Sequence, residues 1–280
     1  MSETMNDSPR EGLPVNPTPY VPPPPVGPRR EILELHYSDP FRWLARGWKD
    51  LMCAKGVGLF YGVCFWAMAL LLWAVFSRLP EYTMSLISGC LLVGPFLAMG
   101  LYEVSRRCEQ RLQPDLIYSL TCWDQRVGSM GMLVLVLIVL ELLWGRASLV
   151  VFAVFFNTGM PSTAGVLQAV FNPENLEFVA VYLVVGGAFA GLVFATSVVS
   201  IPMILDRDTD AISAAITSLE VMFHNTAVML FWGGLIIVLV GVSLAMPWEL
   251  GLLITGPLLG YGSWYAYRGA VRWPQDGTVS

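Results

Sequence analysis

Long apolar stretches alternate with short polar segments along most of the chain, and six of these stretches are long enough to cross a bilayer. A transmembrane helix needs about 20 mostly apolar residues. The six predicted spans are residues 56–77, 84–103, 129–148, 178–203, 226–246 and 249–267. The pattern therefore predicts an all-α membrane protein with six transmembrane helices.

The polar segments before the first, third and fifth spans have a pattern of their own. Each places apolar and polar residues at the spacing of an amphipathic helix, and Asp39-Pro40, Pro114-Asp115 and Asp210 suit the starts of such helices. We expect all three helices to lie on the cytoplasmic surface of the membrane. Their predicted apolar positions are Phe41, Leu44, Trp48 and Leu51; Leu116, Leu120 and Trp123; and Ile212, Ala215, Ile216, Leu219 and Met222.

The second and sixth spans share a motif built around a proline. Gly94-Pro95 precedes Leu97, Gly100 and Arg106, and Gly256-Pro257 precedes Leu259, Gly262 and Arg268, at identical offsets. Pro202 gives the fourth span a weaker version. The unit of amphipathic helix, span and proline-bearing span thus occurs three times. It predicts three helix hairpins around a pseudo-threefold axis, which either build a stable bundle or, as in many transporters, form a transport path.

Prolines and glycines within the spans indicate where helices bend or pack. Pro95, Pro202 and Pro257 each remove a backbone donor, so they are expected to kink their helices. Small residues four apart permit close helix contact. Such pairs occur at Gly58/Gly62, Gly94/Ala98, Gly187/Gly191 and Gly256/Gly260.

Composition supports the membrane assignment. Of the 280 residues, 55% are hydrophobic and 13% are charged, and the mean hydropathy is +0.61. Because a soluble domain is about one quarter charged, this composition argues against a soluble enzyme. The net charge of −5 gives no indication of nucleic-acid binding.

The distribution of basic residues predicts the orientation. With both termini in the cytoplasm, only Arg78 and Arg146 of the 16 basic residues lie outside, as expected for a bacterial inner-membrane protein. Residues 1–30 hold nine of the 19 prolines and no apolar run. They predict a disordered cytoplasmic tail instead of a signal peptide. Residues 31–272 form the predicted membrane domain, and residues 273–280 form a second cytoplasmic tail.

Two charged sites are candidates for function. Glu141 lies inside the third predicted span, where a carboxylate is costly and often functional. It could bind a proton, neutralise a cation, remain protonated or pair with Arg146. The segment Asp206-Arg207-Asp208-Thr209-Asp210 is similar to the start of a calcium loop, but it lacks the required later glycine and glutamate. We therefore expect a turn in which Asp206 or Asp210 pairs with Arg207, and Asp210 caps a helix.

The remaining reactive residue types do not form a familiar site. The five cysteines are odd in number and form no CxxC pair, so a disulfide framework or thiol zinc site is not expected. They are interpreted as small core residues. The chain has two histidines and none of the HExxH, GxSxG, Walker A or GxGxxG motifs. We expect no cofactor and no catalytic site.

Several stretches resemble a bacterial family of integral membrane proteins known as domain of unknown function 2189. They are residues 39–51, 92–107, 199–207 with 210–211 and 217–219, and 260–268. The resemblance extends over residues 30–272 and implies no activity, because none is established for the family. Some members are labelled subunit I of cytochrome c oxidase, but that subunit ligates haem and copper through several histidines. His36 and His224 are too few, although an association with an oxidase stays open.

Two functional hypotheses follow. The first is an accessory, assembly or scaffolding factor of a larger membrane complex, whose partners are the lipid bilayer and other subunits. The alternative is a small-solute or ion transporter or channel with a midplane site near the Gly-Pro positions. An intramembrane enzyme is the third and least favoured hypothesis.

Overall fold

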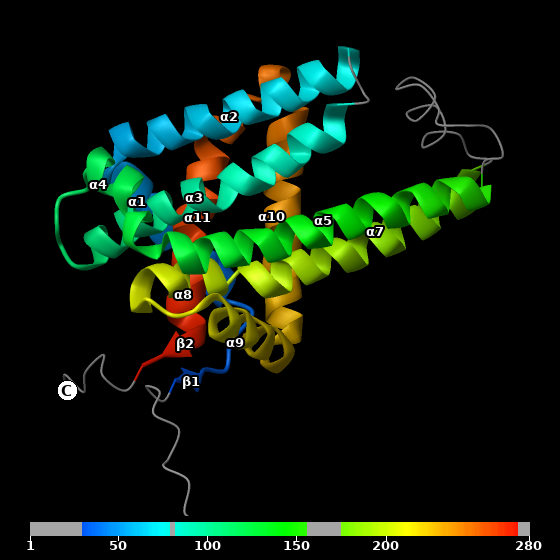
Figure 1. Ribbon diagram of the computed structural model, residues 1–280. Coiled ribbons are helices and arrows are strands. Elements are labelled where there is room, and N and C mark those ends of the chain that lie inside the picture. Colours follow the sequence, from blue (N-terminus) through cyan, green and yellow to red (C-terminus); the bar gives the residue numbers. More distant parts are fainter. Residues whose placement is uncertain (1–29, 79–81, 156–174, 274–280) are drawn as a thin grey trace, which may run out of the picture.

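The structure is a computed structural model that describes residues 30–78, 82–155 and 175–273 (Figure 1). Ten α-helices are described: α1 (Asp39–Cys53), α2 (Lys55–Arg78), α3 (Thr83–Glu109), α4 (Leu116–Thr121), α5 (Val127–Phe155), α7 (Leu176–Ser197), α8 (Ser200–Arg207), α9 (Ala211–His224), α10 (Thr226–Ala245) and α11 (Leu252–Ala270). The short 3-10 helices η2 (Asp124–Arg126) and η4 (Pro247–Glu249) precede α5 and α11. Strands β1 (Glu31–Ile32) and β2 (Val271–Arg272) form an antiparallel pair near the two ends of the described chain.

Four helical segments of the described chain are long and apolar enough to cross a membrane. They are α2, α5, the segment Leu176–Arg207 that contains α7 and α8, and α10, with mean hydropathies of 2.1 to 2.5. The predicted all-helical membrane class is confirmed at this level. Helices α3 and α11 coincide with the predicted second and sixth spans, but they are less apolar. Charged residues are frequent in the last two turns of α3, and tyrosine and tryptophan are frequent in the second half of α11.

Consecutive long helices pack as pairs, and α11 lies between several of them. Helix α2 contacts α3, α5 contacts α7, and α10 contacts α11. The α2–α3 and α5–α7 pairs run across Figure 1, whereas α10 crosses behind them. Helix α11 also packs against α1, α2, α3 and α8, which makes it the most enclosed long helix.

The buried core lies where one set of helix ends converges. It contains the second half of α3, the start of α5, all of α8, the inner face of α9, the start of α10 and the second half of α11. Trp232, Trp264, Tyr261 and Tyr267 are at most 1% exposed. In contrast, only 11% to 22% of the most apolar window of each candidate span is buried. The other ends of the spans therefore present mostly apolar side chains to their surroundings.

In two of the helices predicted to be amphipathic, some of the predicted apolar positions are exposed and others are buried. In α1, Trp43 and Gly47 face the protein, whereas Phe41 and Trp48 are exposed. Helix α1 packs closely because a Cβ on Gly47 would lie 2.9 Å from the backbone nitrogen of Gly262. The two backbones are too close at this contact for a larger side chain. In α9, small side chains are likewise buried (Ala214, Thr217 and Ser218), while Ile212, Ile216 and Phe223 are exposed.

The span prolines are buried, and two of them interrupt no helix. Pro95 lies inside the continuous helix α3 and Pro257 inside α11, so neither proline ends its helix. A break does occur at Val198–Val199, three residues before Pro202, which lies in the first turn of α8. The first turn of a helix tolerates proline because its backbone N–H has no partner there.

Residues at both ends of the described chain make specific contacts. The guanidinium of Arg30 pairs with the Glu220 carboxylate at 2.8 Å. Trp273, at the start of the predicted C-terminal tail, is buried. The predictions for residues 1–29 and 274–280 fall outside the described residues.

Candidate functional site

The helix ends that converge carry a cluster of carboxylates, tyrosines and tryptophans, here called the polar cluster: Arg46, Asp50, Glu103, Arg106, Glu109, Asp206, Arg207, Trp264, Tyr265, Tyr267, Arg268 and Trp273. Asp206 Oδ2 accepts hydrogen bonds from the Tyr267 hydroxyl at 2.7 Å and from Arg207 Nε at 3.1 Å. Trp273 Nε1 donates to the Tyr267 hydroxyl at 3.1 Å. Asp206 therefore joins α8 to α11 and to the residue after β2.

Glu109 joins the end of α3 to the same helix. Its two oxygens accept from Trp264 Nε1 at 3.2 Å and from Arg268 Nε at 3.4 Å. The second guanidinium nitrogen of Arg268 lies 3.9 Å from Asp206, so one arginine contacts both carboxylates. Glu103, one and a half turns earlier in α3, pairs with Arg106 at 2.7 Å.

Asp50 is the most buried aspartate of the cluster. It is 6% exposed, and its Oδ2 accepts from the Tyr265 hydroxyl at 2.9 Å. The guanidinium of Arg46 lies 5.5 Å from the centre of the Tyr265 ring on the same side of α1. Burial raises the pKa of the Asp50 carboxyl, although its hydrogen bonds partly oppose this effect.

Replacing Asp50 with asparagine is expected to stabilise the protein at neutral pH. A raised pKa means that the folded state holds the Asp50 proton more tightly than the unfolded state. The stability from this proton is complete below the unfolded pKa of about 4 and is lost as the pH rises through the folded value. The amide oxygen of the asparagine would still accept from Tyr265. Thermal unfolding between pH 4 and 8 should show the variant above wild type at pH 7 and equal to it near pH 4. A less stable variant at pH 7 would contradict this reading.

The cluster is built for holding helices together. Asp50, Glu109 and Asp206 each accept from an aromatic side chain of α11, and each belongs to a different helix. The described residues contain no group of three or more His, Cys, Asp or Glu positioned to hold a metal ion. Charged hydrogen bonds that are this well paired fix positions more readily than they supply a free acid or base.

The structure brings together only part of the predicted site. Asp206 and Arg207 pair as expected and belong to the polar cluster. Asp210 lies outside it and caps α9, where Oδ2 accepts from the backbone N–H of Ser213 at 2.9 Å. This hydrogen bond lowers the pKa of the Asp210 carboxyl. Pro95, Pro202 and Pro257 are buried in three separate helices.

Replacing Asp210 with alanine is expected to cost about 1 kcal/mol at pH 7, because the cap of α9 is lost. Asparagine should restore most of this stability. Since the pKa is lowered, the contribution of the carboxylate is present above the unfolded pKa and disappears as the pH falls through the folded value. Thermal unfolding of both variants at pH 7 and pH 3 measures this. An alanine variant as stable as wild type at pH 7 would show that the cap contributes nothing.

Glu141 and Arg146 lie in the middle of α5, away from the polar cluster. Glu141 is half-buried on the face of α5 that packs against α7, and it interacts electrostatically with Tyr182. Nearby, the Trp144 ring lies 5.2 Å from the Tyr182 ring. Arg146 is exposed. Five residues of helix separate the two side chains by more than a third of a turn, and no ion pair joins them in the described part of the chain.

Sequence reasoning misses most of the cluster. Trp264 lies near the end of a predicted span, where a tryptophan is typical of an anchor in the membrane interface. In the structure Trp264 is 1% exposed and donates a hydrogen bond to Glu109. Asp50, Tyr265 and Tyr267 lie in stretches that resemble the family, but the resemblance assigns them no role. A further signal is the high density of tyrosine and tryptophan near the end of α11, directly before Arg268.

Part of this chain is similar to a known family. Residues 82–206 match the family described as predicted integral membrane protein (DUF2189). The chain resembles DUF2189 over this range. No curated protein and no solved structure matches the chain.

The DUF2189 region contains only part of the polar cluster. It includes α3, α4, α5 and α7 and most of α8, and so supplies Glu103, Glu109 and Asp206. The predicted resemblance is confirmed here. The similar stretches 39–51 and 260–268 lie outside the matched range, yet they contribute Asp50, Trp264, Tyr265 and Tyr267. The DUF2189 region and the flanking helices therefore meet in one cluster.

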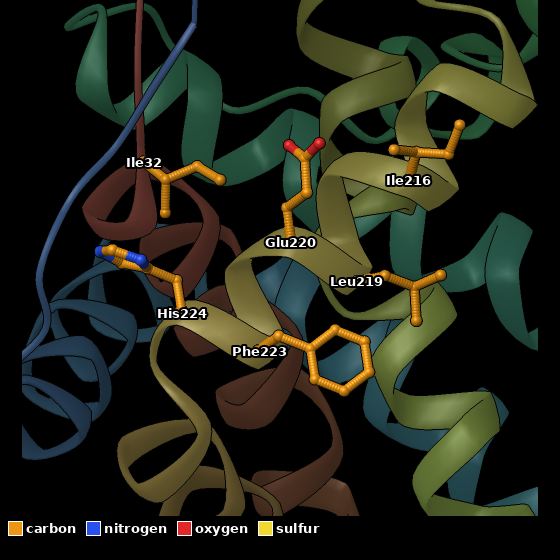
Figure 2. A pocket seen from close by; sticks show the side chains of 6 residues that line it. All are labelled: Ile32, Ile216, Leu219, Glu220, Phe223 and His224. Atoms are coloured by element: carbon orange, nitrogen blue, oxygen red, sulfur yellow. The ribbon is translucent and has the colours of Figure 1, made fainter.

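A shallow pocket lies on the outer face of α9 (Figure 2). Its volume is about 540 Å³, and its lining residues are Ile32 of β1 and Ile216, Leu219, Glu220, Phe223 and His224 of α9. Most of the lining is apolar. The lining contains one carboxylate, Glu220, and it is paired with Arg30. His224 therefore has no unpaired carboxylate beside it among the residues that line the pocket.

Proposed function

We propose that the chain is a six-span integral membrane protein that acts as a non-catalytic accessory, assembly or scaffolding factor of a larger membrane complex. One observation carries the proposal. Hydrogen bonds and ion pairs join the polar groups at the converging helix ends to one another, while the candidate spans leave most of their apolar surface uncovered. Such a surface suits lipid and the helices of other membrane proteins.

The polar cluster supports six spans instead of four. It joins the end of α1, the end of α3, the end of α8 and the end of α11 by direct side-chain contacts. If α3 or α11 did not cross the membrane, these ends would lie on opposite sides. The clustered ends also carry most of the basic residues, which favours the cytoplasmic side of a bacterial inner membrane.

The hairpin repeat is part of the same proposal. Pairs α2–α3, α5–α7 and α10–α11 are its three units, and α1, α4 and α9 precede them. Each preceding helix exposes apolar side chains, among them Phe41, Ile117 and Ile216. These side chains suit the boundary between headgroups and acyl chains, where amphipathic helices lie.

The hydroxyl groups of the spans favour the accessory role over transport. The Thr196 hydroxyl donates to the Leu192 carbonyl, and the Ser197 hydroxyl donates to that of Val193. The Thr255 hydroxyl likewise bonds to its own helix and to Ser243. Because these hydroxyl protons are donated to carbonyls of the same helix, they are not free to donate to a solute.

Co-purification at native expression tests the accessory role. The tagged protein is extracted in a mild detergent and analysed by native gel, mass spectrometry and visible spectrum. Migration with defined subunits in fixed ratio supports the proposal. If the protein migrates without other subunits and its visible spectrum shows no pigment, the accessory role is contradicted. The transport hypothesis is then tested by measuring ion flux in a Glu141→Gln variant.

Matched surface variants identify the face involved. Val184 of α7 and Ile237 of α10 are 73% and 72% exposed on different helices. Tryptophan at either site should leave the yield unchanged. Loss of co-purification for one variant and not the other would locate the contact with the partner. Co-purification retained by both variants would place the contact elsewhere.

A further inference from the structure

The ends of α1 and α3 bring two cysteines together that are far apart in the sequence. Cys53 is the last residue of α1, and Cys108 lies in the last turn of α3. Leu51 and Ala54, on either side of Cys53, belong to one apolar cluster with Val104 of α3, and Cys108 packs against this cluster. The packing of the two helices therefore fixes the positions of both thiols.

The two thiols are close enough to influence each other. The thiol of Cys108 interacts with that of Cys53, and the phenol of Tyr261 in α11 is close enough to interact with both. The contacts of Cys64, Cys90 and Cys122 in the described chain include no second cysteine of this kind. Cys53 is exposed, in contrast to the core position that the sequence suggested, whereas Cys108 is half-buried.

We propose that Cys53 and Cys108 are a redox modification site, in which a hydroperoxide oxidises them to a reversible disulfide. An exposed thiol next to a second thiol is the usual arrangement of such a site. The disulfide would tie α1 covalently to α3. The proposal does not depend on the accessory role, because it concerns only the chemistry of this thiol pair.

The chemistry proceeds in two steps. The thiolate of Cys53 attacks one oxygen of the hydroperoxide, so that an S–O bond forms, the O–O bond breaks, and an alcohol or water leaves. The sulfur of Cys108 then attacks the sulfur of the sulfenic acid. An S–S bond forms, the S–O bond breaks, and the leaving hydroxide takes the proton of Cys108 as water. Overall, two thiols are oxidised and one hydroperoxide is reduced.

The surroundings assign the order of the two cysteines. Cys53 is exposed, so an oxidant reaches it first. Cys108 is half-buried, and its burial, together with the negative charge of the nearby Asp50, disfavours a thiolate there. Cys53 is therefore the thiol that is oxidised, and Cys108 is the one that resolves the sulfenic acid.

The test uses the full chain purified in detergent. The protein is treated with hydrogen peroxide, denatured, alkylated with N-ethylmaleimide and mapped by mass spectrometry without reduction. We expect the number of alkylated cysteines to fall from five to three, a linked peptide pair that contains Cys53 and Cys108, and full reversal by dithiothreitol. Sulfenic acid on Cys53 without this link would overturn the proposal, as would oxidation of other cysteines first.

Single replacements separate the two roles. Cys108→Ser should leave Cys53 as a sulfenic acid that dimedone labels, whereas Cys53→Ser should leave Cys108 alkylated after the same treatment. Cys122→Ser is the matched control and should retain the link. A link that survives either Cys53→Ser or Cys108→Ser would assign it to another pair and refute the proposal.

Discussion

Replacing Gly62 with alanine is expected to destabilise the protein by about 3 kcal/mol, at the upper end of the usual cost of overpacking. A Cβ at this position would overlap the backbone carbonyl of Leu253 in α11. A backbone atom cannot turn aside as a side chain can, so α2 and α11 would have to separate. The loss should appear as a fall of about 10 °C in the melting temperature in detergent.

Gly56 provides the matched control within the same helix. A Cβ there would meet nothing within 4 Å. Because alanine favours helix more than glycine does, Gly56→Ala should be neutral or slightly stabilising. If the two variants melt at the same temperature, the close approach of α2 to α11 does not contribute to stability.

Replacing Asp206 with alanine is the second large effect that we expect, a loss of about 3 kcal/mol. The change removes an acceptor of hydrogen bonds from Tyr267 and Arg207 and the nearby carboxylate that Arg268 contacts at 3.9 Å. The Asp206 side chain is only 14% exposed, so water replaces little of what is lost. Tyr267→Phe removes one hydrogen bond and should lie between this variant and wild type. Thermal unfolding and near-ultraviolet circular dichroism measure both the stability and the tryptophan environment.

Asp208 is the control for Asp206, two residues away. It is exposed and has a φ of 51°, a conformation that asparagine tolerates. Asp208→Asn should therefore change the free energy of unfolding by less than about 0.5 kcal/mol. Equal losses in Asp206→Ala and Asp208→Asn would indicate a general effect of charge in this turn instead of the specific contacts of the polar cluster.

The helices themselves could be predicted from the sequence, because the length and apolar character of a span are properties of a continuous segment. Helices α2 and α10 begin and end within one residue of the predicted spans, whereas α5 extends seven residues beyond the predicted end. Close packing at Gly62 and Gly260 also followed from the spacing of small residues, and both would bring a Cβ into contact with another helix. Gly187 and Gly191 have the same spacing but meet nothing within 4 Å.

The inner faces could not be predicted, because lipid reverses the usual signal. In water a large apolar side chain predicts the buried face, but at a membrane surface it also predicts the exposed face. Phe41 and Trp48 are therefore exposed while Gly47 packs against α11. Trp264 presented the opposite case, since an interfacial anchor and a buried hydrogen-bond donor have the same sequence signature. The contact between Cys53 and Cys108 depends on the fold alone.

The most direct test of the account is to measure which side of the membrane each loop faces. Six spans and a cytoplasmic polar cluster together determine the side of every loop. Single cysteines replace Gln113, before α4, and Leu250, before α11, in a chain whose five native cysteines are changed to serine. Both positions are exposed. A membrane-impermeant maleimide on intact cells should label position 250, and position 113 only after permeabilisation. The reverse result, with position 113 labelled from outside, would contradict a cytoplasmic polar cluster and therefore the account, whether α3 fails to cross the membrane or the whole chain is inverted.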